Sequence, residues 1–173
     1  MHPYIHAKNT PDKAAFIMAS SGKITTYKEL DDRSNKIAHL FRKRGLKVGD
    51  GISIFMENNS QFLEICWAAQ RSGLYFTPIS SRLTSSEVEY IHKDCGAKLI
   101  ISSSYLKQVA NDLPELTKNT SHHLMVGGTE NGWDSFDNAI EDMPTTPLED
   151  EEMGQDMLYS SGTTGKPKGI RVP

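Results

Sequence analysis

The stretch GISIFMENNSQFLEICWAAQRSGLYFTPI, residues 51–79, predicts a strand, a helix and a second strand in succession. Its first part, 51–56, is a short apolar run after a glycine-rich turn, which is typical of an interior strand in a parallel sheet. Polar residues at 58–60 can cap the helix that follows, and Gly73 can end it. The run at 74–79 is the second strand. Such a unit predicts an α/β fold.

The same alternation continues on both sides of this stretch. Capping boxes pair Thr26 with Glu29 and Thr84 with Glu87, and each predicts the start of a helix. Pro114 interrupts a weaker helical pattern. The further predicted elements are strands at 14–19, 23–27, 98–102 and 123–126, and helices after Thr26, after Thr84 and over 104–117. We therefore expect a doubly wound, mostly parallel sheet with flanking helices.

Composition limits the classes of function. The chain has 173 residues, 37% of them hydrophobic and 24% charged, which is enough for one ordinary core. A net charge of −3 argues against a nucleic-acid binder or a polybasic membrane surface. The N-terminal residues lack the pattern of a signal peptide, and no apolar run is long enough to span a bilayer. We expect a cytoplasmic protein.

The two cysteines, Cys66 and Cys95, lie in apolar, helical stretches. One disulfide is possible, but we favour two reduced core thiols. The adjacent His122 and His123 would point to opposite faces of a strand and chelate poorly. The sequence predicts no metal site.

The character of the chain changes near residue 141. Residues 141–156 hold seven acids and no base, with two prolines among them. This composition predicts an exposed connector, and an acidic partner-binding segment is the alternative. We divide the chain into an α/β subdomain over 1–140, an acidic linker over 141–155 and a final segment over 156–173.

The final segment holds YSSGTTGKPKG, residues 159–169. Glycines allow close backbone approach, while hydroxyls, N–H groups and lysines can surround phosphate. A Walker A loop would need a glycine where Ser160 stands and a hydroxyl where Pro167 stands, so this is a different loop. A flexible polar linker is the alternative.

The string resembles the signature [YF]-[ST]-S-G-T-T-G-x-P-K-G of the adenylate-forming (AMP-binding) superfamily, at all eleven positions. The resemblance extends upstream through TPDKAAF (10–16), ITTYKEL (24–30), 47–80 and 81–102, and there it is most similar to the acyl-CoA synthetase branch. Gly51 departs from the pattern, because the family usually has Arg after the Gly-Asp pair. The resemblance implies the first subdomain of the adenylate-forming fold, followed by the first strand and loop of the next.

The resemblance also implies a reaction. A carboxylate attacks the α-phosphorus of MgATP, pyrophosphate leaves, and a thiol, that of coenzyme A in the synthetases, takes the acyl group from the adenylate. The resemblance implies ATP, Mg²⁺, coenzyme A and a small-molecule carboxylic acid as cofactors and substrates, and it implies no nucleic-acid partner. By resemblance the nucleotide-binding residues are Ser160, Ser161, Gly162, Thr163, Thr164, Gly165, Lys168 and Gly169. Lys166 occupies the variable position and Tyr159 is interpreted as a packing residue.

In this family most of the enzyme follows the loop, including its catalytic residues. The sequence therefore resembles an N-terminal fragment with no catalytic residue of its own, and we expect it to be inactive alone. Two alternatives stay open: a non-catalytic α/β module that binds a partner, and a superfamily member that loads a carrier-protein thiol. The sequence identifies neither the acid nor the oligomeric state.

Overall fold

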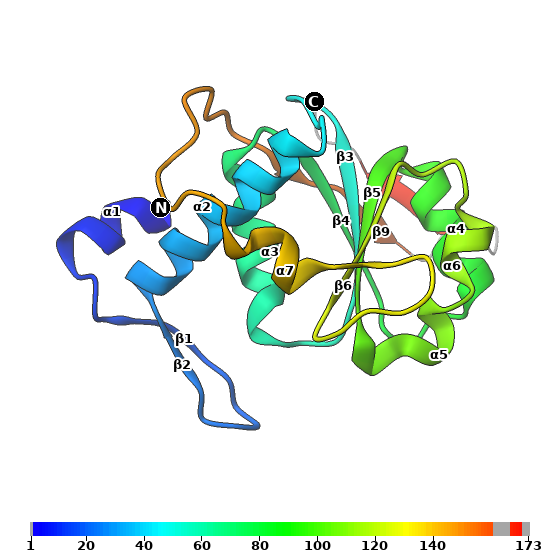
Figure 1. Cartoon of the computed structure of the whole chain (residues 1–173), viewed down its shortest axis with the longest axis horizontal. Helices are drawn as coiled ribbons and strands as arrows, with labels where there is room; N and C mark the ends of the chain where they lie inside the picture. Colours follow the sequence, from blue (N-terminus) through cyan, green and yellow to red (C-terminus); the bar gives the residue numbers. More distant parts are fainter. Residues whose placement is uncertain (1, 161–166, 171–173) are drawn as a thin grey trace.

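The computed structural model describes residues 2–160 and 167–170 (Figure 1). Its elements, in chain order, are α1 (Pro3–Asn9), β1 (Ala14–Ile17), β2 (Ile24–Thr26), α2 (Tyr27–Lys43), β3 (Gly51–Phe55), α3 (Ser60–Arg71), β4 (Tyr75–Ile79), α4 (Ser85–Asp94), β5 (Ala97–Ser103), the 3₁₀ helix η1 (Ser104–Leu106), α5 (Lys107–Ala110), α6 (Leu113–Leu116), β6 (His122–Val126), β7 (Asp134–Ser135), α7 (Phe136–Glu141), β8 (Gln155–Asp156), β9 (Leu158–Ser160) and β10 (Lys168–Ile170).

A six-stranded sheet in the order β7-β6-β5-β3-β4-β8 forms the centre of the molecule. Every neighbouring pair in it is parallel. The chain starts the sheet at β3 and adds strands first on one side and then on the other, which confirms the doubly wound α/β prediction.

Helices cover both faces of this sheet. Helices α2, α3 and α7 pack on one face, where Leu99 and Ile101 of β5 point into the core. Helices α4, α5 and α6 pack on the other, where the intervening Ile100 points. This alternation follows from the two-residue period of a strand. Because both faces are buried, the strands appear in the sequence as continuous apolar runs.

The predicted helix starts are confirmed. The Thr26 N–H donates to Glu29 Oε2 at 2.8 Å, and the Glu29 N–H donates to Thr26 Oγ1 at 3.2 Å. The Thr84 N–H donates to Glu87 Oε2 in the same way, at 2.8 Å. Each contact satisfies a polar group that the first helical turn would leave without a partner.

The two prolines that interrupt elements occupy permissive positions. Pro78 lies inside β4 and pairs with Ile54 of β3, but β8 pairs with β4 only at Tyr75 and Phe76. The side of β4 beyond β8 is therefore an edge, where a missing N–H is tolerated. Pro114 lies in the first turn of α6, and the helical pattern over 104–117 is divided before it, as predicted.

A short antiparallel hairpin, β1 with β2, stands apart from the sheet (Figure 1). Ile17 and Ile24 are partners across it, and both are more than half exposed. The capping box at Thr26 joins the hairpin directly to α2.

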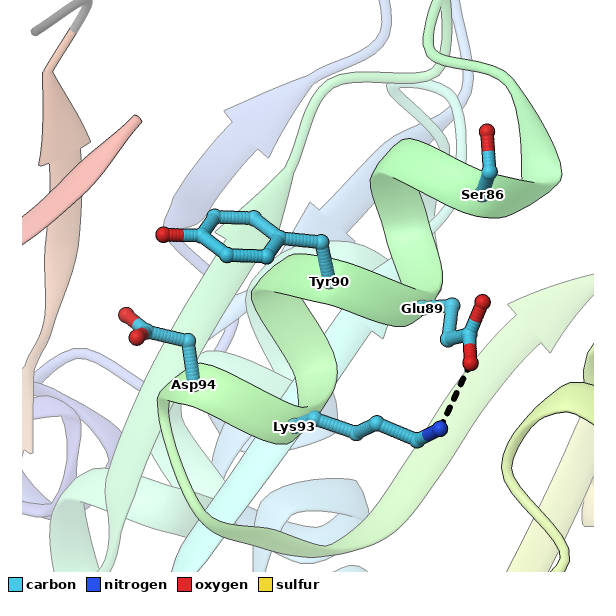
Figure 2. Close-up of a pocket in the computed structure, with 5 residues that line it drawn as sticks. All are labelled: Ser86, Glu89, Tyr90, Lys93 and Asp94. Atoms are coloured by element: carbon cyan, nitrogen blue, oxygen red, sulfur yellow. Dashed lines mark hydrogen bonds and ion pairs between the residues drawn. The ribbon is translucent and has the colours of Figure 1, made fainter. Parts of the chain in front are cut away.

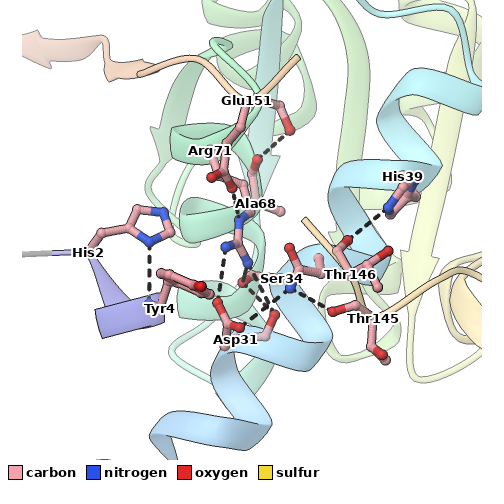
Figure 3. Close-up of polar contacts among 12 residues, drawn as sticks. His2, Tyr4, Asp31, Ser34, His39, Ala68, Arg71, Thr145, Thr146 and Glu151 are labelled. Atoms are coloured by element: carbon pink, nitrogen blue, oxygen red, sulfur yellow. Dashed lines mark hydrogen bonds and ion pairs between the residues drawn. The ribbon is translucent and has the colours of Figure 1, made fainter. Parts of the chain in front are cut away.

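The segment 141–155 is largely exposed, as predicted, but its backbone is attached to α2. The Asn35 amide donates to the Thr145 carbonyl at 2.7 Å, and the His39 ring donates to the Thr146 carbonyl at 2.9 Å (Figure 3). These bonds hold the segment 141–155 against α2.

A buried arginine holds the later part of the connector. Arg71, only 1% exposed, lies between α2 and the connector. Its Nη2 is 3.0 Å from Asp31 Oδ1, its Nε is 2.7 Å from Glu151 Oε1, and its Nη1 donates to Ser34 Oγ at 2.8 Å (Figure 3). The guanidinium has a charged partner on each side, as a buried charge requires.

The connector then enters the sheet through a narrow passage. The Gly154 N–H donates to the Gln70 carbonyl at 2.6 Å, and the Gln155 N–H donates to the Leu74 carbonyl at 3.0 Å. A Cβ on Gly154 would lie 2.4 Å from the Leu74 carbonyl oxygen, so only glycine fits. Residues 155–156 form β8, which pairs with β4 of the six-stranded sheet, and the chain then continues into β9.

Cys66 and Cys95 are both free, in agreement with the reduced-thiol interpretation. Burial raises the pKa of the Cys66 thiol to about 12 and raises the pKa of Cys95 as well. Within residues 2–160 and 167–170, none of the helices has the length and apolar character needed to cross a membrane.

Candidate phosphate-loop site

The candidate site is carried by an antiparallel hairpin made of β9 and β10. Ser160 pairs with Lys168, Tyr159 with Gly169, and Leu158 with Ile170. The two strands therefore bring Ser160 and Lys168 together at the base of the predicted loop.

The hairpin has two distinct faces. Residues directly opposite or two apart share a face, so Leu158, Ser160, Lys168 and Ile170 point the same way. All four are exposed. A hydroxyl, an ammonium group and two apolar side chains thus lie together on one surface.

The other face packs against the domain through Tyr159. Its ring joins the apolar cluster under α4, and its hydroxyl donates to Asp94 Oδ2 at 2.6 Å. Burial, and then this hydrogen bond, raise the pKa of Tyr159, so the phenol keeps its proton at neutral pH. The interpretation of Tyr159 as a packing residue is confirmed.

Gly169 is needed because of that ring. A Cβ built there would lie 2.9 Å from Tyr159 Cζ and 2.5 Å from Met157 Cε. The Met157 side chain could move, but the ring is fixed by Asp94. The absence of a side chain at Gly169 therefore lets the ring cross from one strand of the hairpin to the other.

Helix α4 forms the wall next to the hairpin. Tyr90 and Asp94 point from the helix toward the C-terminal strands, while Glu89 and Lys93 form an ion pair (Figure 2). The Tyr90 hydroxyl donates to the Pro167 carbonyl at 3.3 Å. With Ser86 these four residues line a hollow of about 480 Å³.

Of the predicted nucleotide-binding residues, the structure describes Ser160, Lys168 and Gly169 and brings them together. Ser161, Gly162, Thr163, Thr164 and Gly165 lie outside the described residues, as does Lys166.

Tyr90 and Asp94, which contact the hairpin, are not among the site residues predicted from the sequence. Asp94 carries a weak signal, because it is the last residue of α4 and an acid is disfavoured at a helix C-terminus. In the part of the chain that the structure describes, three or more His, Cys, Asp or Glu side chains nowhere gather as a metal ion would require.

Comparison with known proteins places this geometry in context. A family model described as "AMP-binding enzyme" matches residues 4–172. The chain is 30% identical to a fatty acid–[acyl-carrier-protein] ligase, ScoC, of Streptomyces coeruleorubidus, covering 95% of this chain and 31% of the relative. It is 27% identical to a 3-oxocholest-4-en-26-oate–CoA ligase of Rhodococcus rhodochrous, covering 92% of this chain and 30% of the relative.

A solved structure has the same fold. The anthranilate CoA ligase AuaEII, in complex with anthranoyl-AMP, superposes with a TM-score of 0.84 at 24% identity, covering 97% of this chain and 33% of that one. The chain thus spans about a third of the length of each of these three proteins.

Proposed function

The chain belongs to the AMP-binding enzyme family, and from that membership we propose that it is the N-terminal part of an ATP-dependent carboxylic acid–CoA ligase, with a fatty acid as the favoured substrate class. The observation that carries the proposal is the match over residues 4–172, which includes the whole of YSSGTTGKPKG at 159–169. The names of the relatives support an acid–thiol ligase.

The proposed chemistry has two steps. A carboxylate oxygen attacks the α-phosphorus of ATP, the bond to the β-phosphate oxygen breaks, and pyrophosphate leaves. A thiolate then attacks the acyl carbon, and AMP leaves. Negative charge gathers on the departing pyrophosphate, so donors held beside it stabilise the transition state.

The hairpin supports a role in the first step. It sets the Ser160 hydroxyl and the Lys168 ammonium group on one exposed face, where both can meet phosphate oxygens. We propose that Ser161, Gly162, Thr163, Thr164, Gly165 and Gly169 complete this nucleotide site. Mg²⁺ would reach it with the nucleotide and neutralise phosphate charge.

The domain division and the location are proposals as well. We propose that the acidic linker 141–155 joins a first subdomain, 1–140, to the opening of a second at 156–173. A cytoplasmic location agrees with the supply of ATP and coenzyme A.

The decisive test uses the full reading frame that contains this sequence. We expect exchange of labelled pyrophosphate into ATP that depends on an added carboxylic acid. Lys168→Ala should lower the rate by about 100-fold, because it removes a charged donor from the developing charge. Lys166→Ala is the matched control, and it should keep most of the rate. Exchange that is absent with a broad panel of acids, or equal loss in both variants, would contradict the proposal.

A second acceptor has specific support, since the relative at 30% identity is an acyl-carrier-protein ligase. Supplying coenzyme A and a phosphopantetheine-bearing carrier protein in parallel distinguishes the two acceptors. We expect the thioester to form on coenzyme A.

The remaining alternative is a non-catalytic module. The intact mass of the protein in its source separates it from an enzyme, because a ligase of the relatives' length would be far heavier than the 19.3 kDa of this chain. A product of 19.3 kDa would favour the binding module. In that case the purified chain should show no pyrophosphate exchange.

A further inference from the structure

Two side chains at the end of α4, Tyr90 and Asp94, contact the hairpin and have no role in the function proposed above. They are four residues apart and therefore share one face of the helix. Figure 2 shows both pointing toward the C-terminal strands, away from the Glu89–Lys93 ion pair.

We propose that Asp94 and Tyr90 are positioning residues for Ser160 and Lys168, because each contacts the residue that precedes one of them. The inference deepens the proposed function and rests on it. It concerns how Ser160 and Lys168 come to be in place before the nucleotide arrives.

The two contacts fall on different sides of the Ser160–Lys168 pair, one in β9 and one at the residue that precedes β10. Asp94 Oδ2 accepts a hydrogen bond from the hydroxyl of Tyr159, the residue directly before Ser160, at 2.6 Å. Tyr90 donates to the carbonyl of Pro167, the residue directly before Lys168, at 3.3 Å. Helix α4 thus contacts the residue immediately preceding Ser160 and the residue immediately preceding Lys168.

The Tyr159 ring links the two strands to each other. It lies against Gly169, where an added Cβ would be 2.9 Å from Cζ. The ring therefore contacts both strands of the hairpin. The exposed face of the hairpin, with Ser160 and Lys168, is supported from behind by this contact and by α4.

The location of Asp94 argues for a role beyond helix stability. It is the final residue of α4, where the helix dipole favours a cation and disfavours a carboxylate. Lys93, just before it, follows the usual preference. A residue that opposes its local environment, and has a specific distant partner, is one that we expect to serve the site.

Positioning matters here because phosphoryl chemistry depends on donors that are already in place. Donors fixed before the reaction need no reorganisation when charge develops on the leaving pyrophosphate. Supporting side chains that lock the contacting groups are the usual means. Loss of such support should impair the use of ATP and leave the binding of the carboxylic acid unchanged.

The kinetic test uses the full reading frame and five variants. Asp94→Ala, Tyr159→Phe and Tyr90→Phe each remove one partner of a contact. Asp94→Asn keeps an acceptor oxygen for the phenol, and Lys93→Ala is the control on the same helix.

We expect Asp94→Ala and Tyr159→Phe to lower kcat/KM for ATP about tenfold, with KM for the acid within about twofold. Tyr90→Phe should act in the same direction. Asp94→Asn should restore most of the loss, and Lys93→Ala should match the wild type. A rise in KM for the acid as large as the loss in kcat/KM for ATP, or no rescue by Asp94→Asn, would overturn the positioning role.

A second measurement does not depend on activity. Hydrogen exchange of the peptide covering Lys168–Ile170 should become about tenfold faster in Asp94→Ala and Tyr159→Phe, because the hairpin opens more often. It should stay unchanged in Asp94→Asn and Lys93→Ala. Wild-type exchange rates in Asp94→Ala would refute the proposal. A wild-type protein without pyrophosphate exchange would instead refute the ligase function, and the two failures are thus distinguishable.

Discussion

The two faces of the central sheet bury polar groups in opposite ways. On the face covered by α2 and α3, Arg71 is 1% exposed and remains charged between Asp31 and Glu151. On the face covered by α4, His92 is also 1% exposed, and burial lowers its pKa to about 4. One face therefore buries a cation, and the other buries a neutral ring.

The difference lies in what each group demands of its surroundings. A buried guanidinium needs carboxylates, and Arg71 obtains one from α2 and one from the connector. A neutral imidazole needs only hydrogen-bond partners, and His92 has the hydroxyls of Ser53 at 2.7 Å and Thr120 at 2.6 Å. The charged Arg71 links distant segments, and its contribution to stability depends on its carboxylate partners. The contribution of the neutral His92 depends instead on pH.

The largest effect should come from removing the buried cation. Arg71→Ala leaves Asp31 and Glu151 without their partner, and we expect a loss of about 3–5 kcal/mol in the free energy of unfolding. Glu151→Gln should cost much less, because Glu151 is partly exposed. Urea unfolding of the purified variants measures both. A loss below about 1 kcal/mol for Arg71→Ala would break the contrast between the two faces.

The neutral face should respond to acid. Above pH 6.5 His92 is uncharged in both the folded and the unfolded chain. Between pH 6.5 and about 4 only the unfolded chain takes up the proton, so the folded state loses stability as pH falls through this window. The shift corresponds to about 3 kcal/mol in total.

Urea unfolding at pH 7.5 and pH 4.5 measures this loss, with His92→Gln as the comparison. The variant starts with lower stability but should lose less on acidification than the wild type. Arg71→Lys, which keeps a cation on the other face, should show the wild-type dependence on pH. Equal acid loss in His92→Gln and the wild type would exclude His92 as its source.

A smaller effect should follow from filling the space beneath Tyr159. Gly169→Ala puts a methyl group 2.9 Å from Tyr159 Cζ, and overpacking of this kind costs about 1–3 kcal/mol. We expect the cost to appear mainly as faster hydrogen exchange in β9 and β10. Gly128→Ala is the matched control, because its Cβ would lie 3.5 Å from Ser104 Cβ, an ordinary contact.

The smallest effect should come from an ion pair on the surface. On α4, Lys93 Nζ lies 2.5 Å from Glu89 Oε1, and both side chains are partly exposed to solvent. We therefore expect Lys93→Ala to change the free energy of unfolding by at most about 0.5 kcal/mol. Thermal or urea unfolding beside Arg71→Ala provides the comparison. A cost as large as that of Arg71→Ala would show that burial does not set the value of an ion pair in this protein.

Much of the fold could be predicted because its signals are local. The apolar run that became β5 and the capping boxes at Thr26 and Thr84 each lie within a few residues, and the structure confirms them. Short elements without such signals were missed, among them α1 and α7. Their few turns are stabilised by packing, which the local sequence does not reveal.

The site divides in the same way. The motif containing Ser160 and Lys168 could be recognised from sequence alone, since its residue types are contiguous. The contact between Asp94 and Tyr159 that supports the motif could not be predicted, because the two residues are 65 positions apart. The burial of Arg71 could not be predicted either, because an arginine near the end of a helix is usually exposed to water.

The two raised thiol pKa values have a practical consequence for labelling. Thiolates react with maleimides and protonated thiols hardly do, so Cys66 and Cys95 should stay largely unmodified at neutral pH. A cysteine introduced in place of Tyr105, which is 78% exposed, would then carry a fluorophore at one defined position. The two natural cysteines should thus contribute little background labelling to fluorescence measurements.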